Sequence, residues 1–404
     1  MEKKYRINNL WRGENKCYLK SISIFGLLFI GFNYLFAQQT PATIDVSGFY
    51  DSNHHWKDIT DHDQVIVPLK NQPDYVPSQV NEIAGNILLY QQPNGGWPKN
   101  YDMLAILTDD QKKVLDEHKD SNNTTFDNGA TYTQIEYLAK AYSITHNENY
   151  KNAALRGINF MLAAQYNNGG WPQFYPDVSG YRKYITFNDD AMEGIMNLLY
   201  QIINNSKTYS FISNELRTKA EKSFSKGINC ILKSQIKENG KLTVWCQQHD
   251  NIDFSPRGAR TFELASKASE ESANIVELLM NINNPDDKII IAVNAAMNWF
   301  KKVAIKNTRI KTVAAPAEVY KYHATNADRI VVEDSTAPQI WTRYYELETD
   351  RPLFANRDGK KVYQLSDVSR ERRTGYAWYG YWPQKILNKY PAWLEKIKSK
   401  KMNR

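Results

Sequence analysis

Residues 165–199 read QYNNGGWPQFYPDVSGYRKYITFNDDAMEGIMNLL, and weaker copies of this unit lie on both sides of it. The stretch is typical of a helix end, a Gly-Gly-Trp-Pro turn, a loop, and carboxylates that open a new helix. The upstream copy runs from QQPNGGWPKNYD to TTFDNGATYTQIEYLAKAY, and a more diverged copy begins at KSQIKENGKLTVWCQQHD. Trp97, Trp171 and Trp245 keep the register at intervals of 74 residues. A fixed period indicates one repeated supersecondary unit, which we expect to be a helix pair.

Helical periodicity begins at residue 79, where Val80, Ile83, Ala84 and Ile87 mark one apolar face. Similar patterns return near 132–142, 195–202, 275–279 and 288–305. Helices that alternate with long aromatic loops predict a mainly α fold, an α/α toroid of the (α/α)3 type with few short strands. The segment from about 307 loses this periodicity and is dense in Arg, Tyr and Trp, which predicts an irregular wall of a binding cleft.

The first 37 residues differ from the rest, because six Lys or Arg precede the apolar run SISIFGLLFIGFNYLFA, which ends at Ala37. This layout predicts a cleaved secretory signal at 1–37 and a secreted or periplasmic protein, with an uncleaved anchor as the alternative. We expect residues 38–78 to wrap the main domain, which is predicted at 79–404. Without the signal, no stretch is apolar and long enough to span a membrane.

The mature chain has a balance of 45 basic and 42 acidic residues, which gives no indication of nucleic-acid binding. We expect a monomer. Cys230 and Cys246 could pair in an oxidising compartment or remain buried thiols, and their spacing leaves both open. His54, His55 and His62 have no helical pattern or partner cysteines around them, so we expect them in a solvated loop.

Carboxylates stand at the predicted helix starts: Asp127 in FDNGAT, and Asp189 and Asp190 in FNDDAM. One interpretation is helix capping. However, matching positions in neighbouring repeats would converge on one face and so favour a shared site. Clustered carboxylates without His or Cys suit a hard cation such as Ca²⁺, or could be the acid and base of a glycosidase.

A basic group accompanies these acids and is spread over two stretches. Several arginines in one cleft would suit a polyuronate, because the planar guanidinium binds a carboxylate in bidentate fashion. Surface salt bridges are the alternative. Interleaved aromatic residues could form platforms for sugar rings, although the three tryptophans in register are better explained as packing anchors. The basic residues are Arg257, Arg260, Lys267, Arg329 and Arg343, and the aromatic ones are Trp97, Trp171, Tyr175, Tyr181, Trp245 and Trp341.

Taken together, GGWP with FDNGATYTQIEYLAKAY, GGWPQFYP with ITFNDDAM, WCQQHD, PRGAR and the W.RYYEL tail resemble the family 10 polysaccharide lyases, which are pectate lyases. The resemblance covers roughly 79–380. It implies a helical toroid, Ca²⁺, and anti β-elimination on polygalacturonate, an activity of the EC 4.2.2.2 type. By the same resemblance, 79–404 would be the catalytic domain.

The resemblance also implies roles for single residues. Asp127 would be the cleft acid near the cleavage point and a ligand of the metal, and Asp189 and Asp190 would face the Ca²⁺. Arg260 and Arg329 would clamp carboxylates, with Arg257 and Lys267 as further substrate-binding residues, and Arg343 would be the base.

Two residues beside the predicted base depart from the family pattern: Thr342 and Tyr344 stand where Ala and Phe are more usual. A free guanidinium has a pKa of about 12.5–13.8, so a neutral base is scarce. We expect neighbouring cations to disfavour the charge of Arg343 and the activity to be highest in alkaline buffer. The alternatives are a toroidal glycoside hydrolase that uses Asp127 with Asp189 or Asp190, and a polysaccharide-binding protein without catalysis.

Overall fold

The computed structural model describes residues 42–404 except 60–63, 120–122, 206 and 403–404. The predicted signal at 1–37 and the histidine at position 62 therefore lie outside the described residues. Residues 42–404 cluster into one compact unit. No helix in the described part of the chain is long and apolar enough to cross a membrane.

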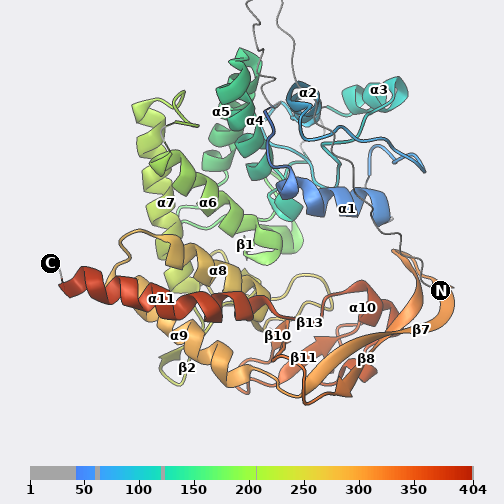
Figure 1. The fold of residues 1–404 in the computed structure, drawn as a ribbon, viewed down its shortest axis with the longest axis vertical. Coiled ribbons are helices and arrows are strands. Elements are labelled where there is room, and N and C mark those ends of the chain that lie inside the picture. The colour runs from blue at the N-terminus through green and yellow to red at the C-terminus, as the bar shows by residue number, and fades with distance from the viewer. Residues whose placement is uncertain (1–41, 60–63, 120–122, 206, 403–404) are drawn as a thin grey trace, which may run out of the picture. The chain divides into compact units, whose positions relative to one another are not determined.

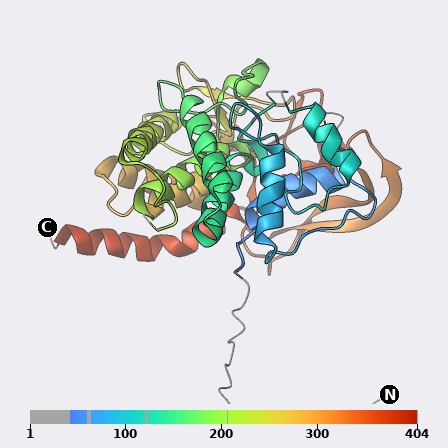
Figure 2. The same cartoon turned by 90° about the horizontal axis from the view of Figure 1, so that it is seen from above.

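The main helices form two rows, here called the outer row and the inner row. Both can be followed along the chain in Figures 1 and 2. Each outer helix contacts the next outer helix, and each inner helix contacts the next inner helix. The outer row is α2 (Val80–Tyr90), α5 (Glu148–Ala163), α7 (Asn214–Ser234) and α9 (Asp287–Val303), and the inner row is α4 (Tyr132–Thr145), α6 (Ala191–Asn204), α8 (Ser269–Asn281) and α11 (Trp382–Met402). The predicted repeat of helix pairs is thus confirmed.

The tryptophans in register are packing anchors, as expected, and each is completely buried. Each indole Nε1 donates to a carbonyl of the preceding outer helix: Trp97 to Ile87 O (2.8 Å), Trp171 to Met161 O (2.9 Å) and Trp245 to Ile231 O (2.7 Å). Trp341 repeats the contact with Phe300 O in α9 at 2.9 Å. None of these four rings is therefore free to serve as a platform for sugar.

A glutamine in each repeat joins that repeat to the following one. Gln91 Nε2 donates to Gly95 O of its own turn and to Ala153 O of α5, both at 2.9 Å. Gln165 bonds Gly169 O and Ser223 O of α7 in the same way, and Gln235 bonds Thr243 O and Ala292 O of α9. These amides satisfy turn carbonyls that would otherwise be buried without partners, and they hold the outer helices in line.

The prediction of an α/α toroid with few short strands is wrong. Contacts between the helices run from one pair to the next, and within the described residues no extensive contact joins α9 or α11 back to α2 or α4. Between α9 and α11 the chain turns to strands and short helices instead of a further helix pair. Closing a ring needs helix partners on both sides of every pair, and this segment supplies none.

Within the described residues, the strands form five small sheets, each antiparallel. The largest hairpin, β7 (Thr308–Val319) with β8 (Ala324–Glu333), is orange in Figure 1. The other sheets, in strand order, are β12 (Lys361–Val362), β11 (Pro352–Ala355), β10 (Tyr344–Tyr345) and β6 (Lys267–Ala268); β1 (Ile185–Thr186), β4 (Gln248–His249) and β5 (Pro256–Arg257); β13 (Tyr379–Gly380) and β9 (Trp341–Thr342); and β2 (Lys237–Glu238) and β3 (Lys241–Leu242).

Shorter helices complete the fold: η1 (Ser47–Phe49), α1 (Tyr50–Asp58), α3 (Asp109–Glu117), η2 (Asp127–Gly129), η3 (Gly180–Lys183), η4 (Asn188–Asp190), η5 (Leu365–Asp367) and α10 (Arg370–Gly375). The loop expected around His54 and His55 is therefore a helix, α1, which contacts η2. Trp56 fixes α1, because it is buried and its Nε1 donates to Ile66 O at 2.9 Å. Periodicity missed this helix because few of its residues are apolar.

Candidate functional site

The inner helices α4, α6 and α8 begin close together, because η2 contacts η4 and η4 contacts α8. The repeat aligns Asp127 with Asn188 and Asn128 with Asp189. Asn128 and Asp189 share the left-handed backbone conformation, φ 51° and ψ 39°, which Asn and Asp tolerate better than most residues. The predicted convergence of the acidic helix starts is thus observed.

These acids do not cap their helices, in contrast to the first of the two interpretations of the sequence. The outer helices α5, α7 and α9 are capped by the side chains of Asn147, Ser213 and Asp286. Among the described residues, no side chain makes the equivalent hydrogen bond at the start of α4, α6 or α8. The carboxylates near these starts are therefore available for other contacts.

Asp127 is a buried carboxylate with both oxygens engaged. Its Oδ2 lies 2.5 Å from Lys99 Nζ, and its Oδ1 accepts from Gln173 Nε2 at 2.9 Å. Burial alone would raise the pKa of Asp127, but the Lys99 ammonium holds it below the ordinary value. The carboxylate is therefore fixed in its charged form.

In the described part of the chain, no cation lies within hydrogen-bond distance of Asp189. Its side chain is 26% exposed, and the nearest guanidinium nitrogen, Arg343 Nη2, lies 3.8 Å from Oδ1. Burial and the charge of Asp127 raise the pKa of Asp189 well above its ordinary value. Asp190 is exposed, and its Oδ1 accepts from Asn274 Nδ2 at 2.6 Å. Negative charge at Asp189 is thus incompletely compensated.

Arg343 is buried among carboxylates of the third repeat. Its Nη2 lies 2.7 Å from Glu271 Oε1 and 3.1 Å from Asn188 Oδ1, and its Nε lies 3.1 Å from Glu270 Oε2. Burial alone would lower the pKa of Arg343, but Glu270 and Glu271 raise it well above the ordinary value. The expectation that neighbouring cations disfavour its charge is therefore not met.

Arg260 is held differently, with its side chain 46% exposed. Its Nε donates to Glu263 Oε2 at 2.8 Å, and Glu263 is fully buried. Burial would lower the pKa of Arg260, but Glu263 raises it well above the ordinary value. The Tyr376 ring centroid lies 5.9 Å from the Arg260 Cζ and 5.0 Å from the Arg343 Cζ, so one ring borders both guanidinium groups.

Tyr376 also links these groups through hydrogen bonds. Its hydroxyl donates to Glu263 Oε1 at 2.9 Å and lies 2.5 Å from the hydroxyl of Tyr344. Tyr344 in turn donates to Gln247 Oε1. The hydroxyl of Tyr344, where the family pattern favours Phe, therefore belongs to the network that positions Arg260.

Comparison with known proteins finds similarity to pectic acid lyases and family 10 polysaccharide lyases. The family model for pectic acid lyases matches residues 91–387. A family 10 polysaccharide lyase from Cellvibrio cellulosa is 30% identical over 86% of this chain and 98% of its own, with a TM-score of 0.66. A mutant of a family 10 lyase from the same organism, in complex with trigalacturonic acid, is 33% identical over 77% and 91%, with a TM-score of 0.65. No curated protein matches the chain.

The chain belongs to the pectic acid lyase family. The resemblance seen in the sequence is thus confirmed, and the protein is a polysaccharide lyase. The structure brings together four of its predicted site residues at the inner helix starts: Asp127, Asp189, Arg260 and Arg343. Asp190 borders the same cluster.

The lyase places its other predicted binding residues elsewhere or at the margin. Arg257 pairs with Asp250 at 3.0 Å on β5. Lys267 is completely buried, with its Nζ 2.7 Å from Glu238 and 2.5 Å from Asp350. Neither is brought to the cluster, and their roles in binding remain predictions.

Arg329 adjoins the site through Tyr376. It lies on β8, and its Nη1 donates to the Tyr376 carbonyl at 2.9 Å. Partial burial lowers the pKa of Arg329, and no acidic side chain among the residues that the structure describes pairs with it. A substrate carboxylate at this edge would supply the missing anion, so the predicted clamp is compatible with the geometry.

Several residues of the lyase site were not singled out in the sequence. Lys99 could have been found, because it follows Trp97 by two residues, as Gln173 follows Trp171, and both side chains bind Asp127. Glu270 and Glu271 stand at the start of a periodic helix and could also have been found. Glu263 and Tyr376 gave no local signal.

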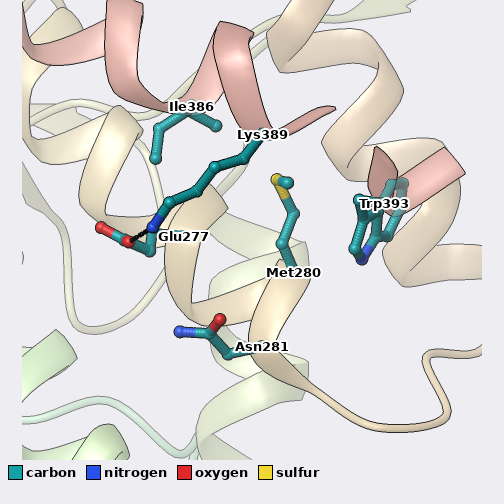
Figure 3. Close-up of a pocket in the computed structure, with 6 residues that line it drawn as sticks. All are labelled: Glu277, Met280, Asn281, Ile386, Lys389 and Trp393. Carbon is teal, nitrogen blue, oxygen red and sulfur yellow. Dashed lines mark hydrogen bonds and ion pairs between the residues drawn. The ribbon is translucent and has the colours of Figure 1, made fainter. Parts of the chain in front are cut away.

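Two cavities of the lyase lie away from this cluster. One, of about 160 Å³, lies between α8 and α11, and Figure 3 shows Lys389 from α11 directed at Glu277 of α8. Their ion pair, Nζ to Oε1 at 2.6 Å, already satisfies the charges there. The second cavity lies beside the first repeat's turn. Cys230 and Cys246 are both free and buried, so the structure has no disulfide between them.

Proposed function

We propose that this lyase is a pectate lyase of the EC 4.2.2.2 type, cleaving α-1,4-linked polygalacturonate by Ca²⁺-assisted anti β-elimination to 4,5-unsaturated oligogalacturonides. The observation that carries the proposal is the juxtaposition of Arg260 and Arg343 with Asp127 and Asp189 at the inner helix starts. The complex of a family 10 lyase with trigalacturonic acid supports the choice of substrate. We further propose that the protein is exported and acts as a monomer.

Elimination removes the proton on C5 and expels the glycosidic oxygen on C4. The C5 proton becomes acidic when the adjoining carboxylate is neutralised, and guanidinium groups do this by bidentate hydrogen bonds. Arg329, which has no acidic partner among the described residues, is our proposed clamp for a substrate carboxylate. Lys99 keeps Asp127 charged while the substrate is bound.

The acidic residues fit a divalent cation whose coordination shell is completed by ligands from the substrate. Within the described residues, no three or more His, Cys, Asp or Glu side chains are grouped closely enough to hold a metal alone. Asp189, without a cationic hydrogen-bond partner, and Asp127 offer the hard oxygen ligands that Ca²⁺ prefers, with Asp190 close by. When bound, Ca²⁺ would neutralise the uronate carboxylate. We propose that this carboxylate supplies the missing ligands.

Exposure favours a base other than the one inferred from the sequence. Arg343, the predicted base, has a side chain only 9% exposed and is held by two glutamates. Arg260 is 46% exposed, and its hydrogen bonds within the described residues use Nε and Nη2 but not Nη1. We therefore propose that Arg260 takes the C5 proton and that Arg343 orients Asn188 and the carboxylates. As a base, Arg260 must be neutral to accept the proton, and Glu263 raises its pKa. We therefore expect activity to rise toward alkaline pH.

The test is the ultraviolet absorbance of unsaturated uronide, with polygalacturonate and either Ca²⁺ or a chelator. We expect Ca²⁺-dependent absorbance that falls about 10²–10⁴-fold in Arg260→Ala, the usual range for a general base. In Arg260→Lys partial activity would accompany a shift of the pH profile toward lower pH, because the ordinary pKa of lysine, about 10.4, lies below that of arginine. If Arg260→Ala keeps the pH dependence of the wild type and Arg343→Ala loses it, Arg343 is the base. Reducing ends without absorbance would indicate a hydrolase, and binding without products would indicate a binding protein.

A further inference from the structure

The second cavity, here called the Tyr175 pocket, has a volume of about 310 Å³ and lies beside the turn at 93–94. Its lining includes Asn94, Arg156, Asn159, Phe160, Ala163 and Tyr175. The volume is at the lower end of the range for pockets that bind small ligands. None of the lining residues belongs to the cluster of Asp127, Asp189, Arg260 and Arg343.

The pocket combines an aromatic face with a free positive charge. Tyr175 is half-buried and meets the Phe160 ring edge-on, with centroids 5.6 Å apart, and its backbone N–H donates to Thr124 O at 3.1 Å. Arg156 bonds Gln91 Oε1 and has no ion-pair partner within the described ranges. An aromatic ring packs against the apolar face of a sugar, and an unpaired guanidinium binds a carboxylate.

Amide groups at the rim add hydrogen-bonding capacity for hydroxyls. Asn94 Nδ2 donates to Thr124 Oγ1 at 2.9 Å, and its Oδ1 accepts from Gly96 N at 3.0 Å. These bonds fix the amide in place. Asn159 is exposed on the helix turn next to Arg156.

The second repeat carries different side chains at the corresponding positions. The repeat aligns Arg156 with Lys226, because a Cβ at Gly95 would meet Arg156 O and one at Gly169 would meet Lys226 O. It also aligns Ala163 with Lys233, whose Nζ lies 5.7 Å from the centroid of the Phe254 ring. The pocket of the first repeat is thus lined by the small side chain of Ala163, where the second repeat has the longer Lys233.

We propose that the Tyr175 pocket binds a uronate residue of the polysaccharide, as a site separate from the cleavage site. The identity of the polymer rests on the proposed function. Tyr175 provides the sugar platform that the buried tryptophans do not, and Arg156 takes the carboxylate. Long chains would then be retained at two points, which raises the effective concentration of substrate at the cleavage site.

Binding of tetragalacturonate to the full-length protein in chelator, followed by calorimetry, tests the proposal without cleavage. We expect two binding events. Arg156→Ala should weaken one of them about tenfold or more, as for loss of a charged hydrogen bond. Tyr175→Leu should weaken the same event. A neutral galactan fragment should not bind there. The matched control is Lys226→Ala, at the equivalent position of the second repeat, and it should bind like the wild type.

Kinetics provide the second readout, since the pocket should affect KM for long polygalacturonate much more than kcat. Tyr175→Leu guards against misfolding of Arg156→Ala, which loses its bond to Gln91, and unchanged thermal unfolding shows which variants are folded. If both folded variants bind tetragalacturonate and polymer like Lys226→Ala, the proposal is overturned. If two binding events are seen in chelator but no unsaturated product forms from polygalacturonate once Ca²⁺ is supplied, the pocket stands and the proposed function fails.

Discussion

The turns η2 and η4 share the backbone conformation of their second residue but differ in chemistry. In η2 the carboxylate is Asp127, held between Lys99 and Gln173, and the left-handed position is the neutral Asn128, whose Nδ2 donates to Asn100 Oδ1 at 2.7 Å. In η4 the first position is neutral Asn188, and the carboxylate has moved to the left-handed position, Asp189. The repeat thus supplies a scaffold, and a one-residue shift of the acid changes which charge is compensated and which is available.

The largest expected effect on activity comes from giving η4 the neutral residue that η2 has at the matching position, Asn128. Asp189→Asn keeps the backbone conformation and removes the available carboxylate. We expect kcat/KM on polygalacturonate to fall about 10²–10³-fold, the scale for losing a group that stabilises transition-state charge, with a raised Ca²⁺ requirement. Asn128→Asp, which adds a carboxylate to the other turn, is the control. Activity within a factor of three of the wild type in Asp189→Asn would refute the assignment of Asp189.

Removing the cation from η2 tests the compensated carboxylate. Lys99→Met leaves the buried Asp127 without its ammonium, and breaking a buried pair in this way costs about 3–5 kcal/mol. Lys99 is 29% exposed, so we expect about 3 kcal/mol in the free energy of unfolding from denaturant titration. The double variant Lys99→Met with Asp127→Asn should recover much of it. Equal destabilisation of the single and double variants would contradict the proposed pairing.

In the third repeat, Glu270 is expected to make the stability of the protein depend on pH. Burial raises the pKa of Glu270 to about 7 despite Arg343. The native state therefore binds this proton more tightly than the unfolded state, so stability from this group is present below the unfolded pKa of about 4.5 and is lost as pH rises through about 7. Glu270→Gln should abolish this loss. The free energy of unfolding of the variant, relative to that of the wild type, should therefore rise by about 1–2 kcal/mol between pH 5 and pH 8. Parallel stability profiles for the two proteins would contradict the shifted pKa.

The smallest effect is expected at the network behind Arg260. Tyr344→Phe removes the hydroxyl that joins Gln247 to Tyr376 and restores the usual family residue. We expect a two- to tenfold change in kcat, because a net hydrogen bond contributes about 1 kcal/mol. Tyr363→Phe, which removes a tyrosine hydroxyl bonded to Glu346 instead of to Gln247 or Tyr376, is the matched control. A loss comparable to that of Asp189→Asn would mean that Tyr344 takes part in the chemistry directly.

Local patterns predicted the helix pairs, the tryptophan anchors and the acidic helix starts, because each depends on periodicity within one repeat. They did not predict that the ring stays open, since closure depends on contacts between distant ends of the chain. The strand β6 pairs with β10, where Lys267 lies opposite Tyr345, and no short-range signal marks such a partner.

The site follows the same rule as the fold: its motif residues were predictable from the sequence, and their long-range contacts were not. Asp127, Asp189, Arg260 and Arg343 follow from motifs, whereas their electrostatic settings come from residues far along the chain. Arg343 was assigned as base from its motif, but its glutamates stand 72 and more residues away. Tyr376 reaches Glu263 across 113 residues, and only the folded chain brings them together.

The glutamines Gln91, Gln165 and Gln235 have a consequence for how the protein comes apart. Each ties a turn to the outer helix of the following repeat, so loosening one helix removes hydrogen bonds from the repeat before it. Stacked repeats can in general open from their ends one at a time. Here the shared amides should make amide protons of neighbouring repeats exchange together, as a single cooperative foldon, and the carboxylates between them should lose their geometry at the same moment.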